Sequence, residues 1–162
     1  MATPTRGNAT TFTTPSDREI VITRVFDAPR RLIFEAWTNP EHLPHWMLGP
    51  GGWTMPICEI DLRPGGAWHF GWRHSNGTEM EMRGVYQEIV PPERLVSTES
   101  WGGDWPETLN TLTLSEADGK TTMTNTVLYP SKEARDAALQ TGMKEGMSLS
   151  FDRLAEYLRN MT

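Results

Sequence analysis

The sequence of 162 residues contains one cysteine, Cys58, so no disulfide can form within the chain. It has no apolar run near the roughly 20 residues that a helix needs to cross a bilayer. Residues 1–17 are rich in Thr and Pro and lack the apolar segment that directs export. We therefore expect a cytoplasmic protein whose thiol stays reduced.

The sequence also has fewer basic than acidic residues. Lys and Arg number 15 against 21 Asp and Glu, which gives a formal net charge of −6. Non-specific binding of nucleic acid and docking on an anionic membrane both need a basic surface. The balance of charge therefore argues against nucleic-acid and membrane partners.

The common sequence signatures of catalysis and metal binding are missing as well. His42 and His45 are three residues apart, but Pro44 interrupts the turn and no third ligand lies nearby. Neither a Gly-x-Ser-x-Gly motif nor a phosphate loop with its lysine occurs. Cys58 has no flanking Lys, Arg or His that would activate its thiol. We expect no metal, no cofactor and an inert, buried thiol.

Large apolar side chains, in contrast, are plentiful, with seven Trp and nine Met. The length suits one domain, which we place at residues 18–162 behind a flexible N-terminal tail at 1–17. Trp brings a large apolar surface and Met adapts to irregular shapes. This composition fits either a bulky core or an adaptable apolar pocket.

Runs of β-branched residues, separated by turn residues, predict most of the folded part. A first strand is followed by two short helices, at 30–38 and 41–47, and then by six more strands. The predicted strands lie at 18–26, 53–61, 67–74, 79–90, 95–101, 107–115 and 121–129. A long amphipathic helix begins at its N-cap Ser131, and its apolar stripe continues to Leu158. The order predicts an α+β fold in which a seven-stranded antiparallel meander packs on the long C-terminal helix.

Three positions inside these elements carry further expectations. Pro56 cannot donate a hydrogen bond to a neighbouring strand, so the strand at 53–61 should be an edge strand or a bulged one. Gly142 and Gly146 each cost about 0.5–1 kcal/mol relative to Ala inside a helix. Such a cost indicates close packing or a break in the helix near them.

The strand at 67–74 gives the strongest local signal. Alternation along it gathers three large aromatic rings and a histidine on one face: Trp68, Phe70, Trp72 and His74. This face is either a plain core beneath the helix or the wall of an apolar ligand cavity. Met143 and Met147 should face the sheet from the helix, where flexible thioethers either fill gaps or adapt to a ligand.

Glu99 is the best candidate for a buried polar group. It alternates with Leu95, Ser97 and Trp101, so we expect it on the same face of its strand as these residues. A carboxylate in that environment needs a partner or a raised pKa. Glu79 and Glu81 also share a strand face, which a solvated outer surface explains.

Several short motifs, in order and at natural spacing, resemble those of a known family. They are Phe26-Asp27-Ala28-Pro29, Ala36-Trp37-Thr38-Asn39-Pro40-Glu41, Trp46, Asp61-Leu62-Arg63-Pro64-Gly65-Gly66, Tyr86 with Pro91-Pro92-Glu93-Arg94-Leu95, and Gly146 with Leu154. Over about residues 18–160 the chain resembles the AHSA1-like branch of the SRPBCC (START/Bet v 1-like) superfamily. Most of these motifs are turn and packing residues, so they specify the fold better than the function.

The resemblance implies a helix-grip fold, in which an antiparallel sheet wraps around a long C-terminal helix and leaves a deep cavity between them. Relatives bind hydrophobic ligands such as lipids, polyketides or flavonoid-like aromatics. Some relatives are cyclases or aromatases, and one eukaryotic relative activates the Hsp90 ATPase. That activator carries a separate N-terminal domain, for which residues 1–17 are too short. The chain has Met47 and Met147 where the family often has tryptophan, which implies a cavity of altered shape.

The main hypothesis is that the protein binds a small hydrophobic or aromatic molecule in a cavity between the sheet and the C-terminal helix. The residues expected to line or gate this cavity are Trp46, Trp68, Phe70, Trp72, Tyr86, Trp101, Met143 and Met147, and those expected to supply polar contacts are His45, His74 and Glu99.

Two alternatives stand beside this hypothesis. One is an enzyme of cyclase, aromatase or hydrolase type, in which a His or Glu moves a proton. The other is a protein-interaction role, including partnership with an Hsp90-type chaperone, which an exposed apolar patch would favour. A homodimer is compatible with the sequence, because closed two-fold assembly is the commonest oligomer, but no residue pattern indicates one.

Overall fold

The computed structural model describes residues 9–103 and 105–161. The strands are β1 (Thr11–Thr13), β2 (Glu19–Phe26), β3 (Trp53–Ile60), β4 (Ala67–His74), β5 (Glu79–Val90), β6 (Arg94–Glu99), β7 (Thr108–Ala117) and β8 (Lys120–Leu128). The helices are α1 (Arg30–Thr38), the single 3-10 turn η2 (Leu43–His45), α2 (Lys132–Leu139) and α3 (Met143–Met161).

All these strands form one antiparallel sheet in the order β1-β2-β8-β7-β6-β5-β4-β3. From β3 to β8 each strand pairs with the next one along the chain, as the predicted meander requires. β2 departs from this rule, because it pairs with β8 over its full length. α1 and η2 carry the chain from β2 to β3, which forms the opposite edge of the sheet.

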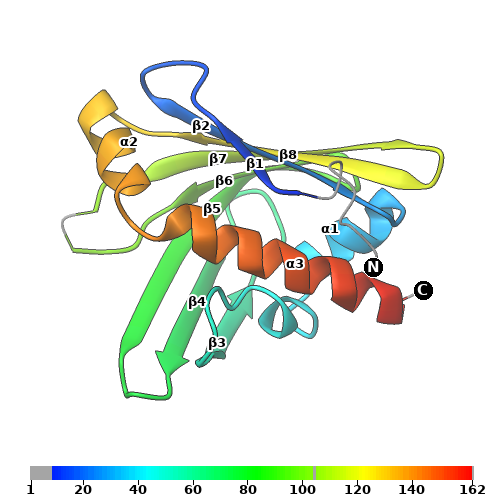
Figure 1. The fold of residues 1–162 in the computed structure, drawn as a ribbon, viewed down its shortest axis with the longest axis horizontal. Coiled ribbons are helices and arrows are strands. Elements are labelled where there is room, and N and C mark those ends of the chain that lie inside the picture. Colours follow the sequence, from blue (N-terminus) through cyan, green and yellow to red (C-terminus); the bar gives the residue numbers. More distant parts are fainter. Residues whose placement is uncertain (1–8, 104, 162) are drawn as a thin grey trace.

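α3 lies across one face of the sheet (Figure 1). In that view β3, β4 and β5 run steeply away from β2, β7 and β8, and α3 lies in the angle between the two groups. Buried side chains of α3, among them Phe151, Leu154 and Leu158, join the inner faces of the strands in one hydrophobic core. The predicted α+β helix-grip arrangement is confirmed.

The sheet has eight strands and not the seven predicted. The additional strand, β1, comes from the segment expected to be a tail, whose residues 1–8 lie outside the described residues. In β1 the half-buried Phe12 lies opposite Ile22 of β2. Three residues with one apolar side chain are too short to show the alternation that identifies a strand.

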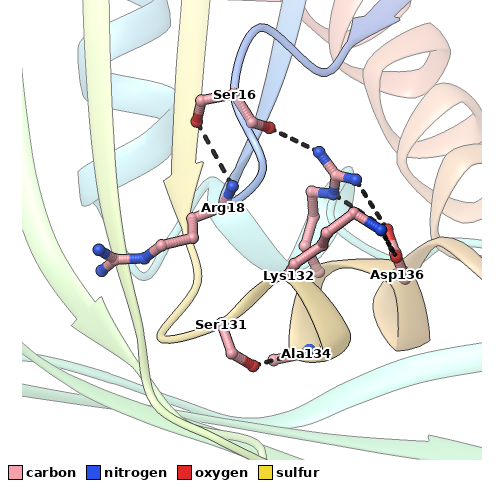
Figure 2. A network of polar contacts seen from close by, with 7 residues as sticks. Ser16, Arg18, Ser131, Lys132, Ala134 and Asp136 are labelled. Carbon is pink, nitrogen blue, oxygen red and sulfur yellow. Dashed lines mark hydrogen bonds and ion pairs between the residues drawn. The ribbon is translucent and has the colours of Figure 1, made fainter.

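A polar network ties the chain after β1 to α2 (Figure 2). The Arg135 guanidinium donates to the backbone carbonyl oxygen of Ser16 at 2.5 Å and to the Asp136 carboxylate at 2.8 Å. Lys132 donates to the same carboxylate at 3.2 Å. These contacts fasten residue 16 to a helix that is far away in the sequence.

The predicted C-terminal helix is divided into α2 and α3. Ser131 caps α2 as predicted, because its Oγ accepts the Ala134 N–H at 3.0 Å. The division at residues 140–142 includes the exposed Gly142, so a break explains that glycine. Gly146 lies inside α3, where an added Cβ would make an ordinary van der Waals contact with Cδ of Pro50 at 3.7 Å, so neither a break nor close packing explains this glycine.

Two local predictions near the start of the sheet have different outcomes. Pro56 lies in an edge strand whose pairing with β4 shifts register between Thr54 and Ile57, so the predicted edge position and irregularity are both confirmed. The second short helix, predicted over 41–47, is the single 3-10 turn η2.

Gly84 on β5 is the tightest point on the inner face of the sheet. A Cβ at this position would lie 1.9 Å from the carbonyl oxygen of Thr98 and 2.4 Å from Cζ2 of Trp68. Both distances are far below any van der Waals contact, so the indole of Trp68 lies directly on the glycine. The absence of a side chain at residue 84 therefore lets the aromatic side chains of β4 lie close to the sheet.

Gly84→Ala should lower the free energy of unfolding by about 3 kcal/mol, because the ring of Trp68 or the β6 backbone must move. Gly142→Ala is the matched control, since nothing lies within 4 Å of an added Cβ there. The control should change stability by less than about 1 kcal/mol, toward greater stability. Urea denaturation followed by far-UV circular dichroism measures both, and equal losses would contradict the close packing at Gly84.

Candidate functional site

A row of aromatic side chains runs along the inner face of β4. Trp68, Phe70 and Trp72 are buried, and neighbouring ring centroids are 4.7 and 6.1 Å apart. The row continues to Trp101, just after β6, whose ring stacks on Trp72 with centroids 5.5 Å apart and planes at 20°. Trp101 is 41% exposed, so this end of the row is open to solvent.

The loop after η2 holds Trp72 in place and connects it to α3. The indole N–H of Trp72 donates to the Met47 carbonyl oxygen at 2.8 Å. Two residues later, the Gly49 N–H donates to Oγ of Ser150 at 2.9 Å, and the Arg153 guanidinium donates to the Gly49 carbonyl oxygen. The position of the aromatic row and the position of α3 therefore depend on the same loop.

Glu99, the last residue of β6, joins the open end of this row. Its Oε1 accepts the indole N–H of Trp101 at 3.0 Å. The side chain is half-buried, and burial raises the pKa of Glu99 to about 7, while the hydrogen bond from Trp101 partly opposes the rise. Burial, together with the charge of Glu99, raises the pKa of Tyr129 to about 12. Glu99 is therefore an inner-face carboxyl that changes charge near neutral pH.

Polar side chains that the sequence analysis did not single out lie beside Glu99. Thr108 of β7 is its partner in the register, and the next inner-face pair is Ser97 with Asn110. Nδ2 of Asn110 donates to Oγ1 of Thr108 at 3.0 Å. The alternation of Thr108 and Asn110 with Leu112 along β7 is the signal that was available in the sequence.

The helices cover this face of the sheet unevenly. Buried residues of α3 begin at Ser150, whereas Met143 and Met147 in its first turns are only half-buried. None of the eight residues of α2, all of which the structure describes, is buried. On the sheet, Met80 lies opposite Trp72 and is 41% exposed. Apolar inner-face surface therefore remains open to solvent.

The comparisons identify the family to which this architecture belongs. The family model described as "Activator of Hsp90 ATPase homolog 1-like protein" (AHSA1) matches residues 27–159. The chain belongs to the AHSA1-like family. The resemblance seen in the sequence motifs is thereby confirmed.

Solved structures agree with this assignment. A protein from Rhodobacter sphaeroides is 29% identical with a TM-score of 0.89, over 94% of this chain and 99% of that one. A Mycobacterium smegmatis protein, Ms6760, is 25% identical with a TM-score of 0.83, over 93% and 96% of the two chains. An AHSA1-like protein from Aeromonas hydrophila shares the fold at 17% identity and a TM-score of 0.69, over 85% and 94%. A comparison with curated proteins found no match.

Two of the ligand contacts predicted for this AHSA1-like chain lie away from Glu99 and Trp101. Trp46 is completely buried, and its indole N–H donates to the Ala36 carbonyl oxygen at 3.0 Å. His45 is exposed, and its ring stacks on Tyr157 of α3 with centroids 5.4 Å apart. The ring of Trp46 packs near Phe151 of α3, with centroids 6.2 Å apart, so both predicted contacts lie against the part of α3 that follows Ser150.

The remaining predicted contacts lie on the inner sheet. Tyr86 is buried on β5, and burial raises the pKa of its hydroxyl, with a smaller contribution from Cys58. Burial also raises the pKa of the Cys58 thiol to about 11, which agrees with the expected inert thiol. His74, at the end of β4, is half-buried and lies edge-on to Trp53 with centroids 4.9 Å apart.

Two hollows in the described part of the chain lie near this end of the sheet. One of about 430 Å³ is at β4, β5 and β6, where Trp68, His69 and Arg83 line it. The other, of about 290 Å³, lies at the ends of β7 and β8, where Thr108, Tyr129 and Arg18 line it. The cavity predicted between the sheet and the C-terminal helix stays a prediction.

Metal-binding clusters and membrane-spanning helices are both absent from the part of the chain that the structure describes. Among residues 9–103 and 105–161, no group of three or more His, Cys, Asp or Glu side chains is arranged to hold a metal ion. No helix in that part of the chain has both the length and the apolar character needed to span a membrane.

The raised pKa of Glu99 predicts a pH-dependent stability. The folded protein holds the proton between the ordinary glutamate pKa of 4.5 and about 7, whereas the unfolded chain releases it. The contribution of Glu99 to stability is therefore largest below pH 4.5 and falls as the pH rises to about 7. Glu99→Gln should remove this fall. Urea midpoints of both proteins, measured across that range, test this, and parallel pH profiles would contradict it.

Proposed function

We propose that the protein binds a small hydrophobic or aromatic molecule at the open end of the aromatic row, between the inner face of the sheet and the start of α3. One observation carries the proposal. The ring of Trp101 stacks on buried Trp72 and yet remains 41% exposed. A flat aromatic surface held in place and open to solvent is what a stacking ligand requires.

The surroundings of Trp101 support this function. Met80 on β5 is exposed and lies opposite Trp72, on which Trp101 stacks, so a flexible apolar side chain is free to adapt to a ligand there. Met143 and Met147 at the start of α3 are half-buried and would supply further side chains of this kind. Glu99 and its register partner Thr108 supply a few polar groups at one side. Ligand sites are mostly apolar with a small number of polar groups that fix orientation.

A second candidate function rests on Glu99 alone. A carboxyl with a pKa of about 7 exchanges its proton at neutral pH, as a general acid or base must. An enzyme that uses Glu99 to move a proton on a bound ligand would need the same binding site. A partnership with an Hsp90-type chaperone is suggested by the name of the family alone.

Trp101→Ala should weaken the binding of a neutral apolar probe, N-phenylnaphthylamine, by about twofold to twelvefold, because a stacked pair contributes about 0.5–1.5 kcal/mol. Trp105→Ala is the matched control, since Trp105 follows in the same loop and is 48% exposed. Fluorescence titration of the probe measures both affinities. Unchanged affinity in Trp101→Ala, or an equal loss in both variants, would place the binding surface elsewhere.

A further inference from the structure

Glu99 is a half-buried carboxylate whose charge no described side chain balances. Its hydrogen-bond partner is the neutral indole of Trp101. None of the ion pairs among residues 9–103 and 105–161 involves it. The buried cation on the same face of the sheet, Arg24, pairs with Asp152 at 2.5 Å. A carboxylate without a cation in an apolar environment is costly, and a positively charged ligand would remove that cost.

The aromatic surface beside Glu99 is itself suited to a cation. The face of an indole ring carries partial negative charge and attracts ammonium groups. The N–H of Trp101 points at Oε1 of Glu99, so the carboxylate lies at the edge of the exposed ring. A positive group above the exposed face of the ring, on the side nearest the N–H, would meet both the negative face and the carboxylate.

The net charge of the whole chain also favours a positively charged ligand. The formal net charge is −6, which raises the local concentration of cations and lowers that of anions. The neutral side chains of Thr108, Asn110 and Tyr129 lie around Glu99. Arg18, the cation that lines a hollow with Thr108 and Tyr129, donates to the backbone carbonyl oxygen of Tyr129 at 2.9 Å and not to Glu99. An anionic ligand would therefore meet a Glu99 carboxylate that pairs with no cation among the described residues.

We propose that the ligand is a cationic amine with an aromatic body, which stacks on Trp101 while its ammonium group pairs with the carboxylate of Glu99. This inference rests on the proposed function, because it names the ligand class of the same site.

Three probes with one indole ring and different charges test the ligand class: tryptamine is a cation, skatole is neutral and indoleacetate is an anion. Isothermal titration calorimetry with the full chain measures each affinity at neutral pH. Tryptamine should bind about tenfold more tightly than skatole, and indoleacetate should bind more weakly than skatole.

Glu99→Gln tests the residue. The amide keeps the size of the side chain and an oxygen that accepts the Trp101 N–H, but it carries no charge. Tryptamine should then bind no more tightly than skatole, whose own affinity should stay unchanged, and this second result also shows that the variant is folded. Glu107→Gln removes one negative charge from an exposed residue that borders both hollows, and it should keep the preference for tryptamine.

The outcomes separate this inference from the proposed function. Binding of skatole without a preference for tryptamine would overturn the ligand class and leave the proposed function standing. A preference that survives Glu99→Gln, or disappears equally in Glu107→Gln, would also overturn it, because overall charge would then be its source. Failure of both skatole and tryptamine to bind the unmodified chain would overturn both.

Discussion

The packing of α3 from Ser150 to Leu158 is the constraint on which the rest of the structure depends. Phe151, Leu154 and Leu158 are at most 3% exposed, and the ring of Phe151 meets Phe26 of β2 edge-on at 6.3 Å. A sheet with one apolar face needs a cover, and α3 provides it over this part of the core. The loop that holds Trp72 is fastened to the start of this segment through Ser150. The turns of α3 before Ser150 contribute no buried residue, and Met143 and Met147 there are only half-buried.

The open end of the aromatic row combines two features that an ordinary core avoids. Trp101 exposes a large apolar surface, and Glu99 half-buries a carboxyl group. Each feature partly supports the other, because the indole N–H binds the carboxylate and the ring gains stacking with Trp72. Departures from the rules of packing at one place, in a fold that otherwise obeys them, are expected at functional sites. Because no described cation pairs with Glu99, this site favours ligands that carry a positive charge.

Much of the fold was predictable because Pro and Gly mark the ends of its elements. The predicted bounds of β4, β5 and α1 agree with the structure, and turn residues flank each of them. β1 was missed because three residues carry no periodicity. The pairing of β2 with β8 was missed because the two strands are about a hundred residues apart in the sequence, and local patterns carry no information about such partners. Gly142 and Gly146 look alike in the sequence, yet Gly142 lies in the break between α2 and α3, whereas Gly146 lies inside α3 with room for a Cβ.

The face on which each site residue lies was predictable within its own strand, but the contacts between residues of different strands were not. Alternation placed Glu99 and Trp101 on one face and Trp72 on the inner face of another strand. Their contact depends on the register across β5, which lies between the two strands and shifts against β6 between Tyr86 and Glu88. No pattern in the sequence predicts that shift of register. His45 illustrates the same limit, because its partner Tyr157 comes from the far end of α3. The charged and polar groups around Glu99 come from several strands, and only the folded sheet brings them together. The ligand class therefore has to be inferred from the folded chain.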